Sequence, residues 1–285
     1  MKILKKITEC KSVVNNLKKK GFIIGFVPTM GFLHEGHLSL IKMARKECGR
    51  VFISIFVNPT QFGPGEDFEK YPRDIKRDIS LAEKGGADYI FYPTAKEMYG
   101  PDFKTSVEVK ELGSIMCGKY RPGHFAGVAT VVLKLFNIVR PDKAYFGQKD
   151  YQQLVIIKRM VDDLNLDVEI IGGPAIREND GLALSSRNKY LSVEERKNAI
   201  ILYECLNMVK DMIKKGEKGL EEIRKTIMTD LKQNRFVKKV DYFDFRDPGT
   251  LEHVKRVDND SKNILAATAV WIGRTRLIDN MIIKV

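Results

Sequence analysis

The sequence predicts an α/β protein in which a parallel sheet with helices on both faces is followed by a smaller α+β domain. In the first 175 residues, short and nearly continuous apolar segments alternate with amphipathic ones, a pattern typical of a parallel sheet buried on both faces. Residues 172–174, Gly-Gly-Pro, then interrupt the alternation, and two helical segments precede three strand segments beyond them. We therefore expect two domains, residues 1–175 and 176–285.

The individual elements follow from the same patterns in chain order. In the first domain, strands are expected at 22–27, 51–57, 88–92, 143–146 and 166–171, and helices at 4–20, 36–48, 72–85, 125–139 and 150–164. In the second domain, helices are expected at 193–215 and 217–234, and strands at 237–246, 263–272 and 275–284, the last two joined as a hairpin near Gly273. Pro28 has no N–H and is expected to end the hydrogen-bonding ladder of the first strand. Ligands of parallel sheets bind at the carboxyl ends of the strands, so these ends are where a site is expected.

The composition is that of an ordinary globular protein, with 44% hydrophobic and 30% charged residues. No apolar run approaches the roughly 18 residues of a membrane span, and the lysine-rich N-terminus has no apolar core of a signal peptide. Four widely spaced cysteines form neither a metal-ligand pattern nor a disulfide framework. We expect a cytoplasmic protein without a membrane partner.

The formal net charge of +12 would suit anionic ligands or nucleic acid. However, the lysines are scattered among acidic residues, and no aromatic residues interleave the densest run, residues 18–20. An ordinary solvated surface explains the charge better, so no nucleic-acid partner is expected.

The first segment that carries chemistry is residues 30–37, where a glycine-rich turn joins the first strand to a helix. Backbone N–H groups at such a turn can approach an anion closely, and the positive end of the helix favours phosphate. His34 and His37 are three residues apart, so they point the same way from the first helical turn. Imidazoles can donate to phosphate oxygens on which charge develops. Two surface histidines at a helix cap are the alternative, but the spacing directly after a strand favours nucleotide chemistry.

Two more segments follow strands of the first domain. Asn58 and Gln61 follow the second strand, and their amides can bind donors and acceptors of a small polar substrate, although Asn-Pro also starts ordinary turns. At 145–154, a strand runs into Gly147 and then a helix. Lys149 at that helix start is unfavourable unless an anion is bound, whereas Asp150 could simply cap the helix.

The fourth segment, residues 177–188, is a polar loop at the expected domain junction. Ser185, Ser186 and Arg187 offer two hydroxyls and a fork-shaped cation, which suit phosphate, while a solvated linker is the alternative. His124 precedes a helix and is equally consistent with a site residue and with a structural histidine.

Taken together, the four segments resemble the pantoate–β-alanine ligase (pantothenate synthetase) family, essentially from end to end and in the same order. The matching motifs are residues 28–37, 55–62, 149–153 and 180–188. They are highly specific jointly, whereas His-x-Gly-His alone would indicate only the nucleotidyltransferase superfamily. The resemblance implies a Rossmann-like ATP- and pantoate-binding domain, a C-terminal lid domain, a homodimer and Mg²⁺. It also implies ATP-dependent condensation of (R)-pantoate with β-alanine through a pantoyl adenylate, with release of pyrophosphate and AMP.

The resemblance further implies three groups of site residues. The reaction would depend on His34, His37, Lys149, Ser185, Ser186 and Arg187. ATP would be bound by Met30, Gly31, Phe32, Leu33, His34, Glu35, Gly36, His37, Gly147, Gln148, Lys149, Asp150, Ile176, Leu184, Ser185, Ser186 and Arg187. Gln61 and Gln153 would hold pantoate, and Gln61 would later hold β-alanine.

Asp78 aligns with an acidic position that is linked to the metal in this family, so it is expected to contact Mg²⁺. The sequence offers no other metal cage, and Mg²⁺ would arrive mainly on the phosphates of ATP. The family often has Met where Leu184 stands and Glu where Gln148 stands. We expect these two departures to change nucleotide affinity rather than the reaction.

Two other functions stay open at this point. One is a nucleotidyltransferase that makes a dinucleotide-type product, and the other is a tRNA- or RNA-binding module, suggested by the charge and the histidine turn. Gln61 and Gln153 favour a small hydroxy acid as substrate, and the length leaves no room for a large anticodon-reading domain.

Overall fold

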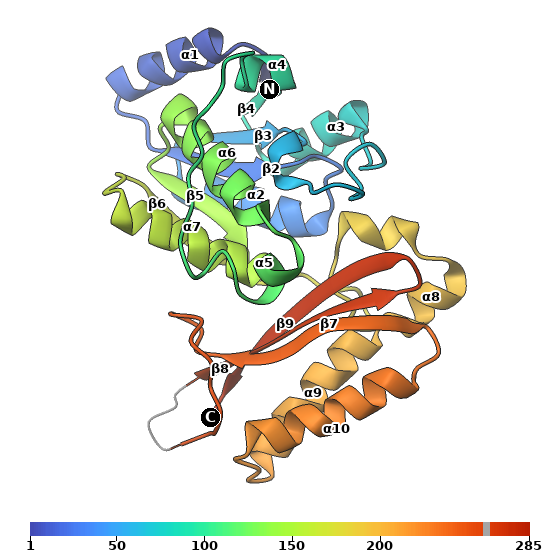
Figure 1. Cartoon of the computed structure of the whole chain (residues 1–285). Coiled ribbons are helices and arrows are strands. Elements are labelled where there is room, and N and C mark those ends of the chain that lie inside the picture. The colour runs from blue at the N-terminus through green and yellow to red at the C-terminus, as the bar shows by residue number, and fades with distance from the viewer. Residues whose placement is uncertain (259–262) are drawn as a thin grey trace. The chain divides into compact units, whose positions relative to one another are not determined.

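The computed structural model describes residues 1–258 and 263–285, which form two compact units (Figure 1). Unit 1 comprises Met1–Gln148 and Ile156–Ala175, and unit 2 comprises Lys149–Val155 and Ile176–Val285. The segment after Gln148 therefore belongs to unit 2 by its contacts, although the sequence pattern placed it within the first domain.

Unit 1 is built on a six-stranded sheet of order β1-β4-β3-β2-β5-β6, in which every neighbouring pair is parallel. The strands are β1 (Lys2–Leu4), β2 (Ile24–Thr29), β3 (Arg50–Ile55), β4 (Tyr89–Phe91), β5 (Lys143–Gly147) and β6 (Glu169–Gly173). The predicted fold class, an α/β parallel sheet with a smaller α+β part, is confirmed.

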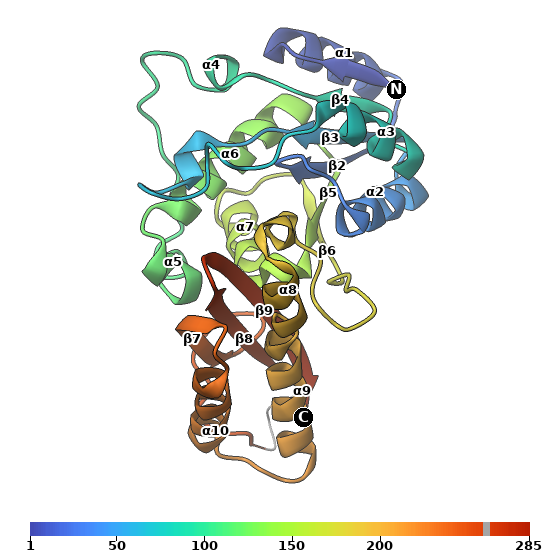
Figure 2. The same ribbon diagram turned by 90° about the vertical axis from the view of Figure 1, so that its right-hand side faces the viewer.

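Helices cover both faces of this sheet. Between β1 and β6 the chain contains the helices α1 (Ile7–Lys19), α2 (Glu35–Glu47), α3 (Ile75–Gly85), α4 (Ala95–Met98), α5 (Met116–Tyr120), α6 (His124–Val139) and α7 (Tyr151–Asp163), with short 3-10 turns η1 (Pro59–Gln61) and η2 (Gln148–Asp150). Figure 2 shows α2 and α3 on one face of the sheet and α6 on the other. α6 also packs against α1. Both faces of the sheet are therefore buried, which explains why its strands are nearly continuous apolar runs.

The strand order places a switch point between β2 and β5. From β2 the chain runs outward through β3 and β4 on one side, and from β5 it runs outward to β6 on the other. In open α/β sheets, ligands bind at the carboxyl ends of the strands at such a point. The turn after β2 and the turn after β5 both start there.

Pro28 lies inside β2 and does not end it, which corrects the prediction. The Ile24 carbonyl accepts a hydrogen bond on the β5 side, and the Thr29 carbonyl accepts one from Phe56 on the β3 side. Alternate residues of a parallel strand direct their backbone groups to opposite neighbours, so Pro28 faces β5 like Ile24. Pairing with β5 stops at Phe26, while pairing with β3 continues to Thr29.

Unit 2 contains a three-stranded antiparallel sheet of order β7-β8-β9. Its elements are η3 (Ser186–Tyr190), α8 (Val193–Asn198), α9 (Ile201–Lys214), α10 (Leu220–Gln233), β7 (Val237–Arg246), β8 (Asn263–Ile272) and β9 (Thr275–Lys284). α10 packs on β7, and α9 packs on β8 and β9. Aliphatic side chains such as Leu206, Ile227 and Ile264 form the core between these layers and are fully buried.

Two other expected elements differ from the structure. Leu4, the expected first residue of helix 4–20, instead ends strand β1, because it pairs with Phe91 and is fully buried. The expected helix 193–215 is two helices, α8 and α9, with a break at Ala199 and Ile200. Neither glycine nor proline stands at the break, so no local residue type indicates it.

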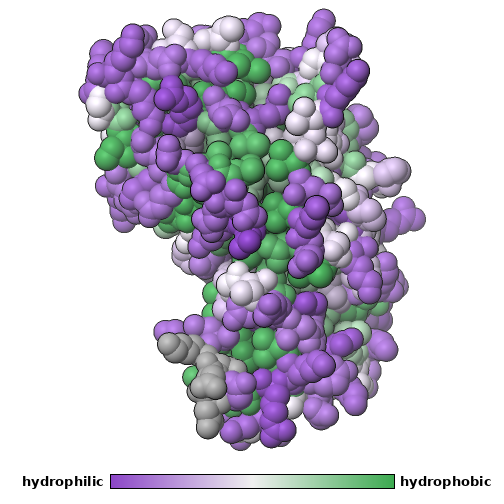
Figure 3. All heavy atoms as spheres, turned by 60° about the vertical axis from the view of Figure 1, so that its left-hand side comes forward, coloured by the Kyte–Doolittle hydropathy of each residue, from purple (hydrophilic) through white to green (hydrophobic). Residues whose placement is uncertain are grey.

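Hydrophilic residues cover most of the face seen in Figure 3, with hydrophobic residues gathered in patches between them. Within the part of the chain that the structure describes, no helix is long and apolar enough to cross a membrane. The four cysteines are buried and unbridged.

Candidate active site

The turn between β2 and α2 is held in an unusual backbone conformation. Gly31 and Phe32 both have positive φ angles, 87° and 50°. A non-glycine residue in this region costs energy and persists only where other contacts hold it. Asp78, from α3, provides those contacts: its carboxylate accepts the N–H of Phe32 at 2.8 Å and the N–H of Leu33 at 2.7 Å.

The carboxylate of Asp78, which we expect from the sequence to contact Mg²⁺, is engaged with the backbone of the turn. Its exposed fraction is 1%, and both carboxylate oxygens already accept backbone hydrogen bonds. Burial raises the pKa of Asp78, although the two hydrogen bonds oppose the shift. Among residues 1–258 and 263–285, no group of three or more His, Cys, Asp or Glu residues could hold a metal ion. The carboxylate acts as an internal anion that fixes the turn.

The side chains of His34 and His37 both accept backbone hydrogen bonds at the start of α2. His34 is the N-cap of α2 and accepts the N–H of Gly36 at Nδ1 (3.2 Å), while His37 Nδ1 accepts the N–H of His34 (3.3 Å). The two ring centroids are 4.1 Å apart. A ring nitrogen that accepts a hydrogen bond carries no proton, so each neutral imidazole holds its proton at Nε2. Both rings therefore present an N–H donor at the atom remote from the cap.

The backbone N–H groups of this turn have protein partners. The N–H of Gly31 donates to Thr29 Oγ1, and the N–H groups of Phe32 and Leu33 donate to Asp78. The N–H of His34 donates to His37 Nδ1. The N–H of Gly36 donates to His34 Nδ1, and that of His37 donates to the His34 carbonyl. We expected these N–H groups to meet an anion directly. Because Asp78 and the two imidazoles supply acceptors instead, the donors that the turn directs to a ligand are imidazole N–H groups. Glu35, at the first position of α2, is exposed.

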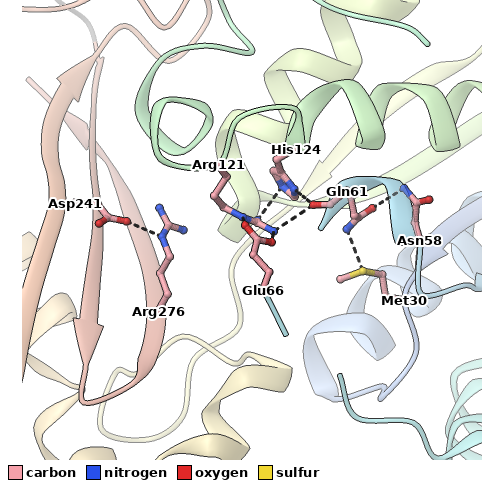
Figure 4. A network of polar contacts seen from close by, with 8 residues as sticks. All are labelled: Met30, Asn58, Gln61, Glu66, Arg121, His124, Asp241 and Arg276. Atoms are coloured by element: carbon pink, nitrogen blue, oxygen red, sulfur yellow. Dashed lines mark hydrogen bonds and ion pairs between the residues drawn. The ribbon is translucent and has the colours of Figure 1, made fainter. Parts of the chain in front are cut away.

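Gln61 lies in a buried network at the end of β3, drawn in Figure 4. Asn58 Nδ2 donates to the carbonyl of Gly127 (3.1 Å) and to Gln61 Oε1 (3.2 Å). Asn58 Oδ1 accepts from Tyr99 Oη at 2.7 Å. A carbonyl only accepts, so the Gly127 contact fixes which end of the Asn58 amide is NH₂, and Asn58 in turn fixes Gln61. Gln61 Nε2 is consequently the end that remains to donate to a ligand, and it lies 3.0 Å from Met30 Sδ, a weak acceptor.

The backbone of Gln61 is held by a second set of residues (Figure 4). His124 Nδ1 is 2.8 Å from the Gln61 carbonyl, to which it donates, and Arg121 Nη1 donates to His124 Nε2 at 3.0 Å. Arg121 also forms an ion pair with Glu66, at 2.8 Å from Nε to Oε1. Burial alone would raise the pKa of Glu66, but the hydrogen bonds and charge of Arg121 outweigh it and hold this pKa below its ordinary value.

These contacts distinguish the ligand-binding role of Gln61 from the supporting roles of Asn58 and His124. Asn58 is 1% exposed, and both ends of its amide form hydrogen bonds to protein groups. It therefore orients Gln61 and is not expected to bind a ligand. His124 is a structural histidine for the Gln61 carbonyl. Sequence reasoning missed Glu66, Arg121 and Tyr99, because the Tyr99–Asn58, Arg121–Glu66 and Arg121–Gln61 contacts join residues 41 to 60 positions apart in the chain.

The segment after β5 is divided between the two units. Gly147 ends β5 and Gln148 starts η2 in unit 1, whereas Lys149, Asp150 and Gln153 belong to unit 2. Asp150 is exposed, and Gln153 is half-buried in the first turn of α7.

Residues 176–184 form a small hairpin that leads into the serine-arginine segment. The Leu184 N–H donates to the Ile176 carbonyl at 2.9 Å, and Arg177 pairs with Ala183. Ser185 then caps η3 by accepting the N–H of Arg187. Ser186 is buried, and Arg187 is half-buried.

The structure thus gathers the predicted residues in two groups. In unit 1, residues 30–37, Gln61 and Gln148 follow strands β2, β3 and β5, and Gly147 ends β5; the carboxyl ends of these strands share one edge of the sheet. Unit 2 holds Lys149, Asp150, Gln153, Ile176, Leu184, Ser185, Ser186 and Arg187.

Comparison with known proteins gives one consistent result. A family model described as pantoate-beta-alanine ligase matches residues 2–282. The chain belongs to the pantoate–β-alanine ligase family. A curated relative named pantothenate synthetase, from Caldicellulosiruptor saccharolyticus, is 57% identical over 285 residues and is covered completely, as is this chain. Another of the same name, from Thermotoga petrophila, is 53% identical over 284 residues, with 99% of this chain and 100% of the relative covered.

Solved structures agree with the sequence relatives. The crystal structure of pantothenate synthetase from Thermus thermophilus has a TM-score of 0.91 and 42% identity, with 99% of each chain covered. The Francisella tularensis pantoate-beta-alanine ligase, solved in complex with beta-gamma ATP and beta-alanine, has a TM-score of 0.76 and 37% identity, with 99% of this chain and 97% of that chain covered. The predicted family and enzyme class are confirmed, and ATP-dependent condensation through a pantoyl adenylate is the reaction of this family.

Proposed function

We propose that this chain joins pantoate to β-alanine in two steps at the residues described above. In the first step, a carboxylate oxygen of pantoate attacks the α-phosphorus of ATP and pyrophosphate leaves. In the second step, the amine of β-alanine attacks the acyl carbon of the pantoyl adenylate and AMP leaves. The observation that carries this proposal is the pair of Nε2–H imidazoles at the switch-point edge of the parallel sheet, where nucleotides bind in such folds.

The first step needs in-line positioning and neutralisation of charge, with little covalent work by the protein. His34 and His37 each donate from Nε2 to oxygens of the phosphate chain as charge builds up there. Preorganised donors of this kind lower the barrier, because they need no reorientation when the charge develops. No serine or cysteine nucleophile is required.

Gln61 holds pantoate through its Nε2–H group. The oxygen of its amide is engaged by Asn58, so the side chain offers a donor and suits a carboxylate or hydroxyl oxygen of the substrate. The contact with Met30 Sδ is weak and gives way to the stronger oxygen acceptor. Gln153 is the second residue for pantoate, and Gln61 later serves β-alanine.

Unit 2 supplies cations for the triphosphate. Lys149 contributes an ammonium, and the segment Ser185 to Arg187 contributes hydroxyls and a guanidinium, which suit phosphate oxygens. Unit 2 is the lid of the enzyme: closure keeps water from the mixed anhydride of the adenylate.

Magnesium enters as part of the MgATP substrate. Asp78 is engaged by two backbone N–H groups, so the phosphates of ATP and water molecules are the ligands in this proposal. The enzyme works as a homodimer, as the resemblance to the family implies, and in the cytoplasm, as the cysteine pattern and the N-terminal composition lead us to expect.

The decisive experiment combines the protein with ATP, Mg²⁺ and pantoate, with and without β-alanine. The proposal predicts AMP release that requires both acids, and pyrophosphate release that requires pantoate. Pyrophosphate release that depends instead on a nucleotide acceptor would support the dinucleotide-forming transferase. A gel shift with bulk tRNA at moderate salt serves as the control for RNA binding.

A further inference from the structure

We propose that Asp279 and Asn280, neighbours on β9, are positioning residues that set the spacing between the two phosphate-binding segments of unit 2. One segment contains Lys149, and the other is the hairpin 176–184 that leads into Ser185. The inference deepens the proposed function, because it rests on the roles given there to Lys149 and to residues 185–187.

Asn280 holds the backbone of Lys149. Its Nδ2 donates to the Lys149 carbonyl at 2.8 Å, and the residue is only 9% exposed. This hydrogen bond joins residues 131 positions apart in the chain. A lysine ammonium sits at the end of a flexible four-carbon chain, so its position depends on a fixed backbone. Asn280 provides that fixed point.

Asp279 holds the hairpin through Arg177. The guanidinium makes a two-pronged ion pair with the carboxylate, at 2.6 Å from Nη1 to Oδ2 and 2.8 Å from Nη2 to Oδ1. Arg177 Nη2 also donates to the Asn280 carbonyl at 3.2 Å, and Nη1 donates to the Gly181 carbonyl at 2.9 Å. The Asp279 side chain is 2% exposed, and the guanidinium lies over the ring of Tyr203. Such bidentate pairs fix direction as well as distance.

The hairpin transmits this position to the serine-arginine segment because it is stiff. Gly181 has a φ of +98°, and a Cβ there would lie 2.0 Å from Tyr203 Cδ1, so the turn fits only glycine. Arg196 clamps the strands of the hairpin from α8, with Nη1 at 2.8 Å from Asp180 Oδ2 and Nη2 at 2.7 Å from Glu178 Oε2. η3, which begins at Ser186, lies next to β9.

The pleat of β9 explains why two consecutive residues can serve two segments. Successive side chains of a strand point to opposite faces of the sheet, and Asp279 and Asn280 pair with successive residues of β8, Thr268 and Ala267. Asp279 reaches the hairpin while Asn280 reaches Lys149. β9 therefore acts as a spacer between the two segments.

The test uses Asn280→Asp, which replaces the N–H donor by a carboxylate facing the Lys149 carbonyl. Displacement of a catalytic group by about 1 Å can cost up to about 100-fold in rate, so we expect kcat/KM for ATP to fall by at least about tenfold. Arg177→Lys keeps the charge but loses the fork and should show a smaller loss in the same direction. The matched control is Thr268→Val, which removes a buried hydrogen bond to the Tyr242 carbonyl on the neighbouring strand. It should lower the melting temperature and leave both kinetic constants per folded enzyme unchanged.

A double-mutant cycle separates positioning from general destabilisation. If Asn280 acts through Lys149, Asn280→Asp should have little further effect on kcat/KM for ATP in a Lys149→Ala background. Full additivity of the two effects would overturn the inference, as would kinetic constants of Asn280→Asp and Arg177→Lys within about twofold of the wild type. If Lys149→Ala alone changes nothing, the proposed role of Lys149 fails instead, and the two failures are thus distinguishable.

Discussion

Replacement of Asp78 by asparagine tests whether this carboxylate anchors the histidine turn or binds a metal. Asparagine keeps one oxygen acceptor but turns an NH₂ group toward the second backbone N–H, that of either Phe32 or Leu33. A buried donor left without an acceptor costs about 1–3 kcal/mol. Removal of the buried charge offsets part of this cost, since burial already raises the pKa of Asp78. We expect a net loss of about 2 kcal/mol in the free energy of unfolding.

That loss corresponds to a melting temperature lower by about 4–8 °C for a unit of this size. The positive φ of Phe32 is no longer held by two bonds, so His34 and His37 shift with the turn and AMP formation falls by at least about tenfold. The assay is thermal unfolding without nucleotide or metal, combined with AMP formation measured over a range of Mg²⁺ concentrations.

The metal hypothesis makes the opposite forecast for the same variant. If Asp78 bound Mg²⁺, Asp78→Asn would leave the metal-free melting temperature unchanged, and high Mg²⁺ would restore activity. That combination of results would refute the anchoring role.

Three further predictions concern the substrates and the pH range. His37→Ala and Lys149→Ala should each lower adenylate formation by about 10²- to 10³-fold with unchanged circular dichroism; normal turnover in either variant would place the chemistry elsewhere. Gln61→Glu replaces the donor by a carboxylate, so KM for pantoate should rise by more than about tenfold while KM for ATP changes little; equal changes in both constants would contradict the assignment. The pKa of Glu66 is held below its ordinary value of 4.5, so its pair with Arg121 should stabilise the protein fully above pH 4.5 and lose this contribution as the pH falls further. Unfolding of Glu66→Gln should lack this pH dependence, and an unaltered profile would show that the pair contributes nothing.

The sequence predicted the elements that follow local patterns. The strands around Phe26 and Phe52 are nearly continuous apolar runs, and the helix that contains Val132 is apolar on most sides, so periodicity and composition suffice to find them. The C-terminal hairpin at Gly273 was predicted for the same reason, and this residue has a positive φ of 56°.

The elements that depend on distant partners escaped prediction. β1 exists because Leu4 pairs with Phe91, and Pro28 stays within β2 because its missing N–H faces the side where pairing with β5 has ended. Neither fact is visible within a window of neighbouring residues. Long-range pairing decided these cases against local preference.

The candidate site shows the same division. The histidine turn and the Ser185 segment could be picked out, because they place unusual residue types next to predicted strands and breaks. The residues that orient them could not: Asp78 and Asn280 look like ordinary polar residues of a helix and a strand until the fold brings them to the Phe32 N–H and the Lys149 carbonyl.

The central claim is that the imidazoles of His34 and His37 receive the phosphate chain of a nucleotide through Nε2. A crystal structure of the enzyme with a non-hydrolysable ATP analogue measures this directly. We predict phosphate oxygens within hydrogen-bonding distance of both Nε2 atoms, with each Nδ1 still accepting its backbone N–H. A triphosphate bound away from the turn after β2, or imidazoles rotated so that Nδ1 meets the phosphate, would contradict the account.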